Sequence, residues 1–113
     1  MRIVERIAVD ELRTMSEKMS ESLVKCVVDV VYRVVVADAG LHTDEELFLL
    51  EQGSKQEDLW GINLWPDLFG TEEFVEFDSM INIRPAQGNR SRGVEEPEVR
   101  RAICEIVSEK VDG

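Results

Sequence analysis

The chain has 113 residues and a formal net charge of −11. This length supports one hydrophobic core, so we expect a single domain over residues 1–113. The acidic balance argues against nucleic acid and anionic membranes as partners, because both attract proteins through a positive field.

The N-terminal residues alternate charged and apolar side chains, and the longest apolar stretch, Leu23–Ala39, is interrupted by four charged residues. Neither pattern is typical of a signal peptide or a membrane span, so we expect a cytoplasmic protein. Cys26 and Cys104 have no histidine at metal-site spacing. We therefore expect buried free thiols, no cofactor and no bound metal.

In chain order, Arg2–Ile7 predicts a short strand, and Asp10–Leu23 has helical spacing with one apolar stripe. Val24–Ala37 alternates strictly and is rich in valine. This pattern predicts one long strand with a fully buried face. Seven residues of that strand share the buried parity: Val24, Cys26, Val28, Val30, Tyr32, Val34 and Val36.

The other face of the predicted long strand alternates charged residues with Val27, Val31 and Val35. Valines in a row on an open sheet face need a cover, and a second copy of the chain is the cover that we predict. The protein is therefore expected to form a homodimer. The loops Gln52–Asp58 and Asp67–Glu73 are the alternative cover.

Asp38–Gly40 predicts a hairpin turn. Leu41–Glu51 fits two structures: a strand that completes the hairpin, or a helix that begins with a capping box from Thr43 to Glu46. We favour the strand, because the long preceding strand needs a partner.

Two further strands, at Leu59–Trp65 and Phe74–Arg84, each end at a proline. Pro97 then begins an amphipathic helix that extends to about Lys110. The resulting order β-α-β-β-β-β-α predicts an α+β fold, in which a mostly antiparallel sheet carries two helices on one face.

A window without acidic residues, Ser79–Val94, follows the segment Asp38–Asp78, which holds twelve acidic residues and the single cation Lys55. Arginine forks and amides on a glycine-containing loop are suited to a carboxylate or phosphate group. The candidate ligand-binding residues are Asn82, Arg84, Gln87, Asn89, Arg90, Ser91 and Arg92. The alternative is structural: the arginines pair with neighbouring carboxylates and the amides hold turns.

A second group collects on the open sheet face if Leu41–Glu51 is a strand. His42, Asp44 and Asp78 are then weak catalytic candidates, and His42, Asp44 and Glu46 are weak metal ligands. The ordinary alternative is a solvated polar face. The sequence contains no known catalytic motif beside them.

Three segments of the chain resemble a family of small prokaryotic proteins known only as a domain of unknown function. They are Leu41–Glu46 (LHTDEE), Gly53–Pro66 (GSKQEDLWGINLWP) and Glu76–Val94 (EFDSMINIRPAQGNRSRGV). The resemblance implies a cytosolic single-domain protein and no particular activity.

Three classes of function therefore remain open. The preferred one is a binding or regulatory module that holds an anionic small molecule or an acidic partner with the arginine loop. A small hydrolase or phosphate-ester enzyme requires His42 and that loop to share one cleft, within about 10 Å. A purely structural homodimer requires Arg90 and Arg92 to be paired and closed to solvent.

Overall fold

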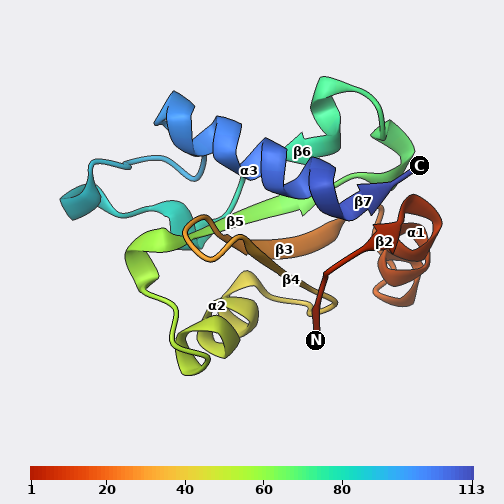
Figure 1. Cartoon of the computed structure of the whole chain (residues 1–113), viewed down its shortest axis with the longest axis horizontal. Helices are drawn as coiled ribbons and strands as arrows, with labels where there is room; N and C mark the ends of the chain where they lie inside the picture. Colours follow the sequence, from red (N-terminus) through yellow and green to blue (C-terminus); the bar gives the residue numbers. More distant parts are fainter.

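The computed structural model describes residues 1–113, with three α-helices around a five-stranded sheet (Figure 1). The helices are α1 (Val9–Lys18), α2 (His42–Glu51) and α3 (Pro97–Lys110). The strands are β1 (Arg2–Ile3), β2 (Ile7–Ala8), β3 (Val24–Asp29), β4 (Val34–Ala37), β5 (Leu59–Leu64), β6 (Val75–Glu76) and β7 (Val111–Asp112). The 3-10 helices are η1 (Gln56–Asp58), η2 (Pro66–Leu68), η3 (Glu72–Phe74), η4 (Met80–Asn82) and η5 (Pro85–Gln87).

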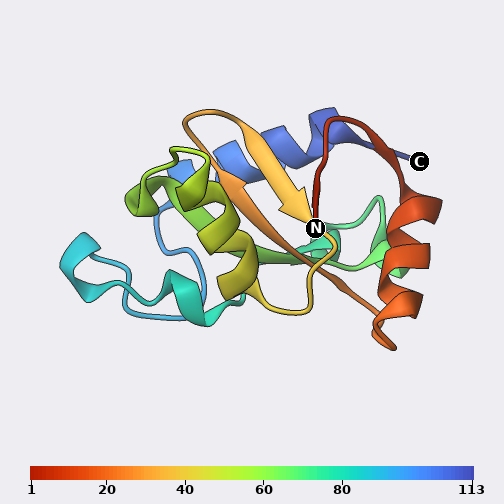
Figure 2. The same ribbon diagram turned by 90° about the horizontal axis from the view of Figure 1, so that it is seen from below.

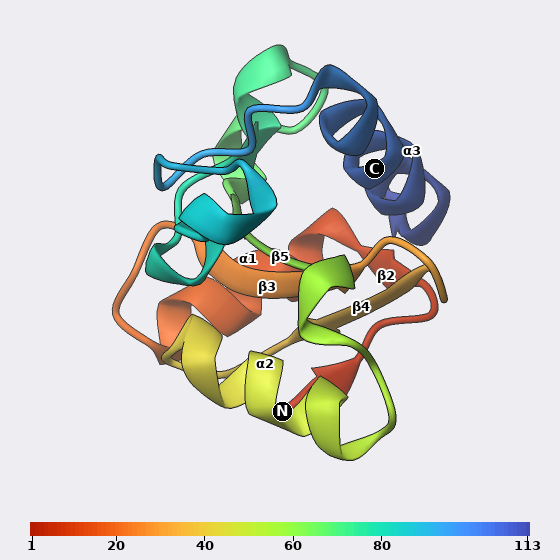
Figure 3. The same cartoon turned by 90° about the vertical axis from the view of Figure 1, so that its left-hand side faces the viewer.

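All neighbours in the main sheet are antiparallel, in the order β1-β4-β3-β5-β6, and β2 pairs with β7 in a separate parallel pair. The sheet lies between two apolar clusters. The larger cluster joins the sheet to α1 and α3, and the smaller one lies under α2 (Figure 3). The smaller cluster consists of Val27, Val36, Leu49 and Leu59.

The α+β class and the mostly antiparallel sheet are therefore confirmed. The predicted order is wrong in detail, because a third helix occupies a place where a strand was expected. α1 and α3 both contribute to the larger cluster, as two helices on one face would, but α2 covers the opposite face (Figure 2).

The predicted long strand Val24–Ala37 is a hairpin of β3 and β4. Asp29 makes the turn: its Oδ1 accepts hydrogen bonds from the backbone N–H groups of Val31 and Tyr32, both at 2.9 Å. Arg33 completes the turn with φ of 59°. The alternating pattern of Val24–Ala37 did not reveal the turn. Valines occur at both odd and even positions of this segment, so they fit either face of either strand.

Leu41–Glu51 is not the favoured strand, because α2 occupies His42–Glu51. β4 already has β3 and β1 as partners, so the sheet needs no strand at this position. The helical alternative holds, although no side chain caps the helix and the expected capping box is not formed. Asp38–Gly40 accordingly leads into a helix and is not a hairpin turn.

Of the predicted strand Phe74–Arg84, only Val75–Glu76 is a strand, and 3-10 helices η4 and η5 follow it. Arg2–Ile7 contains only the two-residue β1 and the start of β2. The strand predicted at Leu59–Trp65 is confirmed over Leu59–Leu64, the helix at Pro97–Lys110 is confirmed, and α1 is shorter than expected.

The three valines that suggested a homodimer do not share one open face. Val27 is buried under α2, Val35 is buried in the larger cluster, and Val31 lies exposed in the hairpin turn. A helix of the same chain is thus the cover, which removes the reason for expecting a second copy there. Both cysteines are free, but only Cys26 is buried, whereas Cys104 is exposed on α3.

Candidate functional site

Asn82, one of the candidate ligand-binding residues, is fully buried and connects three backbone segments. Its Oδ1 accepts from the N–H of Gly61 at 2.8 Å, and its Nδ2 donates to the carbonyls of Gly61 and Arg92, both at 2.9 Å. Gly61 permits the segment before Asn82 to lie this close to β5, because a Cβ at position 61 would lie 2.5 Å from the side chain of Ser79. Asn82 therefore attaches the loop to β5 and is not free to bind a ligand.

Asn89 has the same role within the loop. Its Nδ2 donates to the carbonyls of Asn82 and Gly93, both at 2.8 Å, and of Ser91 at 3.2 Å. Its Oδ1 accepts from the N–H of Glu95 at 2.9 Å. A buried asparagine with both ends of its amide satisfied determines the path of the loop.

Arg84 and Gln87 attach the loop to the segment before β5. The Arg84 guanidinium lies 4.1 Å from the ring centre of Trp60 and donates to the carbonyls of Gln56 and, at 2.7 Å, Leu59. Burial lowers the pKa of Arg84, and nearby carboxylates oppose that shift. Gln87 donates to the Glu57 carbonyl at 2.7 Å. The contacts of these two side chains are structural.

Ser91 and Arg90 donate their backbone N–H groups to one carboxylate oxygen of Glu95, at 2.8 and 2.7 Å. These bonds lower the pKa of Glu95. The hydroxyl of Ser91 also accepts from the N–H of Gly93. The side chain of Arg90 is exposed and has no hydrogen-bond or ion-pair partner in the chain.

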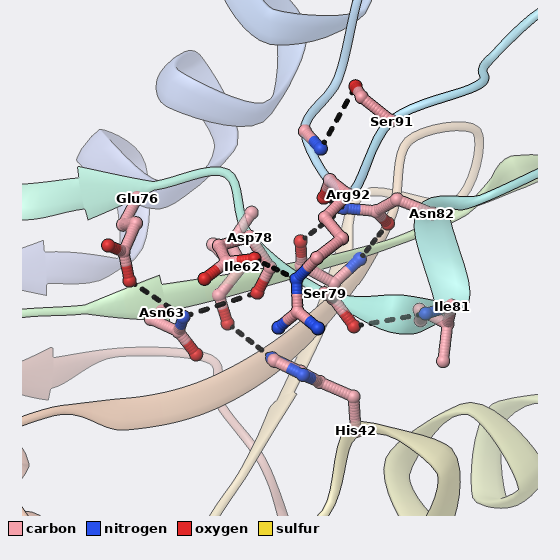
Figure 4. A network of polar contacts seen from close by, with 12 residues as sticks. His42, Ile62, Asn63, Glu76, Asp78, Ser79, Ile81, Asn82, Ser91 and Arg92 are labelled. Atoms are coloured by element: carbon pink, nitrogen blue, oxygen red, sulfur yellow. Dashed lines mark hydrogen bonds and ion pairs between the residues drawn. The ribbon is translucent and has the colours of Figure 1, made fainter.

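Arg92 is the loop arginine that meets the second group of candidates. Figure 4 shows His42, Asp78 and Arg92 converging from α2, from the segment after β6 and from the loop. The Nε of Arg92 donates to Oδ1 of Asp78 at 2.5 Å. The Nε2 of His42 lies 2.8 Å from the carbonyl oxygen of Ile62 on β5. We call His42, Asp78, Arg92 and the neighbouring Lys25 and Asn63 the His42 site.

The protonation of His42 follows from its contacts. Burial lowers its pKa, the charges of Lys25 and Arg92 lower it further, and the Ile62 carbonyl and Asp78 act in the opposite direction. The ring is therefore neutral at pH 7. Because a carbonyl only accepts, the proton lies on Nε2, and Nδ1 is left as an acceptor without a partner in the protein.

Asn63 extends the His42 site along the sheet, where it lies opposite Lys25 on β3 and Glu76 on β6. Its Nδ2 donates to Oε1 of Glu76 at 2.8 Å and to the carbonyl of Asp78 at 3.2 Å. Its Oδ1 is buried without a partner and points away from Glu76 (Figure 4). Trp65 also donates to Glu76, at 3.2 Å.

Asn63 and Lys25 were not among the predicted site residues. A polar residue in the middle of the apolar strand Leu59–Leu64 was the available signal for Asn63. Predicting Lys25 as a site residue would have required the register between β3 and β5, which pairs it with Asn63. An alternating sequence pattern does not give that register.

The remaining candidates do not join the His42 site. Asp44 is exposed on α2, and Glu46 lies on the side of Arg84, whose pKa its charge raises. On a helix Asp44 points to the other side from His42 and Glu46, which are four residues apart and share a side, so the three do not lie on one face as they would on a strand. No group of three or more His, Cys, Asp or Glu side chains is placed to hold a metal ion.

No helix has the length and apolar character needed to cross a membrane.

Comparison of the chain with curated proteins and with solved structures finds no match. A family model described as protein of unknown function (DUF5674) matches residues 1–110, which is nearly the whole chain. The chain therefore belongs to this uncharacterised family.

Proposed function

We propose that the protein is a binding module that holds the carboxylate or phosphate group of a small ligand at the His42 site. The observation that carries the proposal is the state of Arg92. Its guanidinium is about half exposed and uses only Nε, so both terminal Nη groups have no partner in the chain. A fork with two free donors is the group that binds carboxylate and phosphate in fixed geometry.

The surroundings of Arg92 support an anion at this place. Lys25 forms no ion pair, and its charge, like that of Arg92, acts on His42. The neutral His42 adds an acceptor at Nδ1, which suits an O–H or N–H group on the same ligand. The ligand class is thus narrower than the sequence indicated: an anionic group with a hydrogen-bond donor beside it.

The small-enzyme alternative uses the same residues. A neutral histidine beside a carboxylate is the arrangement of a general base, and Nδ1 of His42 would be the basic atom. No metal ligand set accompanies it and the sequence carries no known catalytic motif, so binding is the function that we place first. The structural alternative required Arg90 and Arg92 to be closed to solvent, and both side chains are exposed.

Inorganic phosphate and malate provide the test, because each carries an O–H group beside its negative charge, with the thermal midpoint of unfolding as the readout. A ligand that binds only the folded state stabilises it by about 2.7 kcal/mol at about a hundredfold excess over Kd. We expect a rise in the midpoint for wild type and no rise for Arg92→Ala. Arg90→Ala is the matched control, since it removes an exposed arginine of the same loop that has no partner, and we expect it to respond like wild type.

Arg92→Ala should fold normally without ligand, because its side chain contributes one exposed ion pair and its structural hydrogen bonds come from the backbone. Equal responses of the two variants would contradict the site, and no response of wild type to either anion would contradict the proposed function.

A further inference from the structure

Helix α2 places its side chains in an order that burial alone does not explain. Leu47 is 56% exposed and Leu50 is 36% exposed, whereas Glu45 is fully buried. Both carboxyl oxygens of Glu45 are buried without a hydrogen-bond partner. A helix that served only to cover the sheet would bury leucine and expose glutamate. Conflicts of this kind between local sequence and fold concentrate at functional surfaces.

The two leucines form one apolar strip on the outside of α2, because residues three apart are neighbours on a helix. The 3-10 helix η4 packs beside α2, and Ile81 on it joins the cluster under that helix. Met80 and Ile83 of the same segment are also exposed apolar side chains. The region is therefore larger than a single exposed leucine, which would need no explanation.

Exposed carboxylates border the strip at both ends. Asp44 precedes Leu47 by three residues and Glu51 follows it by four. Neither of these two carboxylates takes part in an ion pair. Unpaired like charges around an apolar strip are repelled by acidic surfaces and attracted by basic ones.

We propose that the outer face of α2 is a docking surface for a cationic amphipathic helix of a partner protein, whose leucine-type side chains meet Leu47 and Leu50. The negative charge around the strip distinguishes among the possible partners. A second copy would bring the same carboxylates against each other in a protein of net charge −11, and an anionic membrane would be repelled in the same way. Lysine or arginine flanking an apolar stripe complements the face.

The probe is a synthetic helix of about 18 residues built from leucine, lysine and alanine, with leucines on one face. A second peptide carries glutamate in place of each lysine. We expect titration calorimetry with the full chain to show saturable binding of the lysine peptide only. In the double variant Leu47→Ser/Leu50→Ser, affinity should fall at least about tenfold, because central apolar contacts carry most of the energy of such interfaces.

Leu68→Ser is the matched control, since Leu68 is 38% exposed in η2, which packs against α1, and α1 and α2 lie on opposite faces of the sheet. Its affinity for the lysine peptide should remain at the wild-type value. Unchanged thermal midpoints would confirm that the substituted chains fold, which is expected for exposed positions.

Three results would overturn the docking surface: no saturable binding of the lysine peptide, equal binding of the glutamate peptide, or equal affinities of the double variant and wild type. Sedimentation of the wild-type chain and the double variant can give a fourth result of this kind. A wild-type dimer that the double variant dissociates would assign the surface to a second copy of the chain.

Discussion

The carboxyl group of Glu45 is buried, and neither of its oxygens forms a hydrogen bond of normal geometry. Burial is the main reason why its pKa rises to about 9, and Asp38 acts in the same direction. The N–H of Ala39 and the charge of Lys25 act against this shift. The group is therefore uncharged in the folded protein at pH 7, whereas it is ionised in the unfolded chain.

This difference makes stability depend on pH in a defined direction. Between pH 4.5 and 9 the folded state keeps a proton that the unfolded state releases, so the free energy of unfolding decreases as the pH rises. The decrease amounts to about 1.4 kcal/mol per pH unit. Glu45→Gln removes it, and the variant should gain stability over wild type as the pH is raised through this window.

Urea unfolding at about pH 5.5, 7 and 8.5 measures the effect. Asp44→Asn is the control, because it neutralises an exposed carboxylate one residue away on the same helix, and its stability should stay parallel to that of wild type. A constant difference between Glu45→Gln and wild type at all three pH values would show that Glu45 is not protonated in the folded state.

At the scale of elements, the β3–β4 hairpin depends on Asp29. This carboxylate is fully buried, and besides its two bonds to the turn its Oδ2 accepts from the hydroxyl of Ser54 at 2.6 Å. Asp29→Ala leaves these donors without their acceptor, so we expect a loss of roughly 2–4 kcal/mol in the free energy of unfolding. Asp29→Asn keeps an acceptor for the turn and should lose about half as much.

Denaturant unfolding of both variants checks the turn. Ser54→Ala serves as the comparison, because it removes only the third hydrogen bond, and its loss should be about 1 kcal/mol. If Asp29→Ala were no worse than Ser54→Ala, the bonds to the backbone of Val31 and Tyr32 would not stabilise the hairpin.

The turn at Asp29 shows why some elements could be predicted from the sequence and others could not. Leu59–Leu64 and α3 were recognisable, because their period, length and proline boundaries agree. The hairpin in Val24–Ala37 was not recognisable, because a turn inside a valine-rich segment reverses the chain without interrupting the alternating pattern of the sequence. α2 was ambiguous for the related reason that it exposes leucines and buries a glutamate, which weakens the helical pattern.

The candidate site was predictable to a similar extent. Composition identified the arginine loop as unusual, but it did not distinguish Asn82 and Asn89, which bind backbone, from Arg92, whose terminal donors are free. That distinction depends on burial and on which backbone groups lie nearby. From the sequence, His42 was predicted near Asp78 on one face of a sheet. The two residues do lie near each other, but His42 is on a helix, so the prediction reached this pair through a wrong secondary structure.

At the scale of the whole molecule, charge repulsion and ion pairing act against each other. The net charge is −11, and all eight ion pairs involve side chains that are partly exposed. Exposed pairs contribute about 0–1 kcal/mol each. The acidic residues in excess of the cations repel one another in the compact state, and salt screens both effects over a distance of about 10 Å at 0.1 M.

Because the excess of carboxylates is large, we expect repulsion to dominate, so sodium chloride should raise the thermal midpoint. The gain should be on the order of 1 kcal/mol, or several degrees for a domain of this size. Asp44→Asn/Glu51→Gln lowers the repulsion near α2 and should reduce the salt response. A midpoint that falls as sodium chloride is added would show instead that the ion pairs dominate.

The salt response also supplies the baseline against which the His42 site is judged. Phosphate at the same ionic strength screens charge as sodium chloride does, so any additional rise in the midpoint reports binding. We expect this additional rise in wild type and in Arg90→Ala, and its loss in Arg92→Ala, where the response to phosphate and to sodium chloride should coincide. Coinciding responses in wild type would mean that phosphate acts by screening alone, and Arg92 would then be a surface ion pair with no ligand.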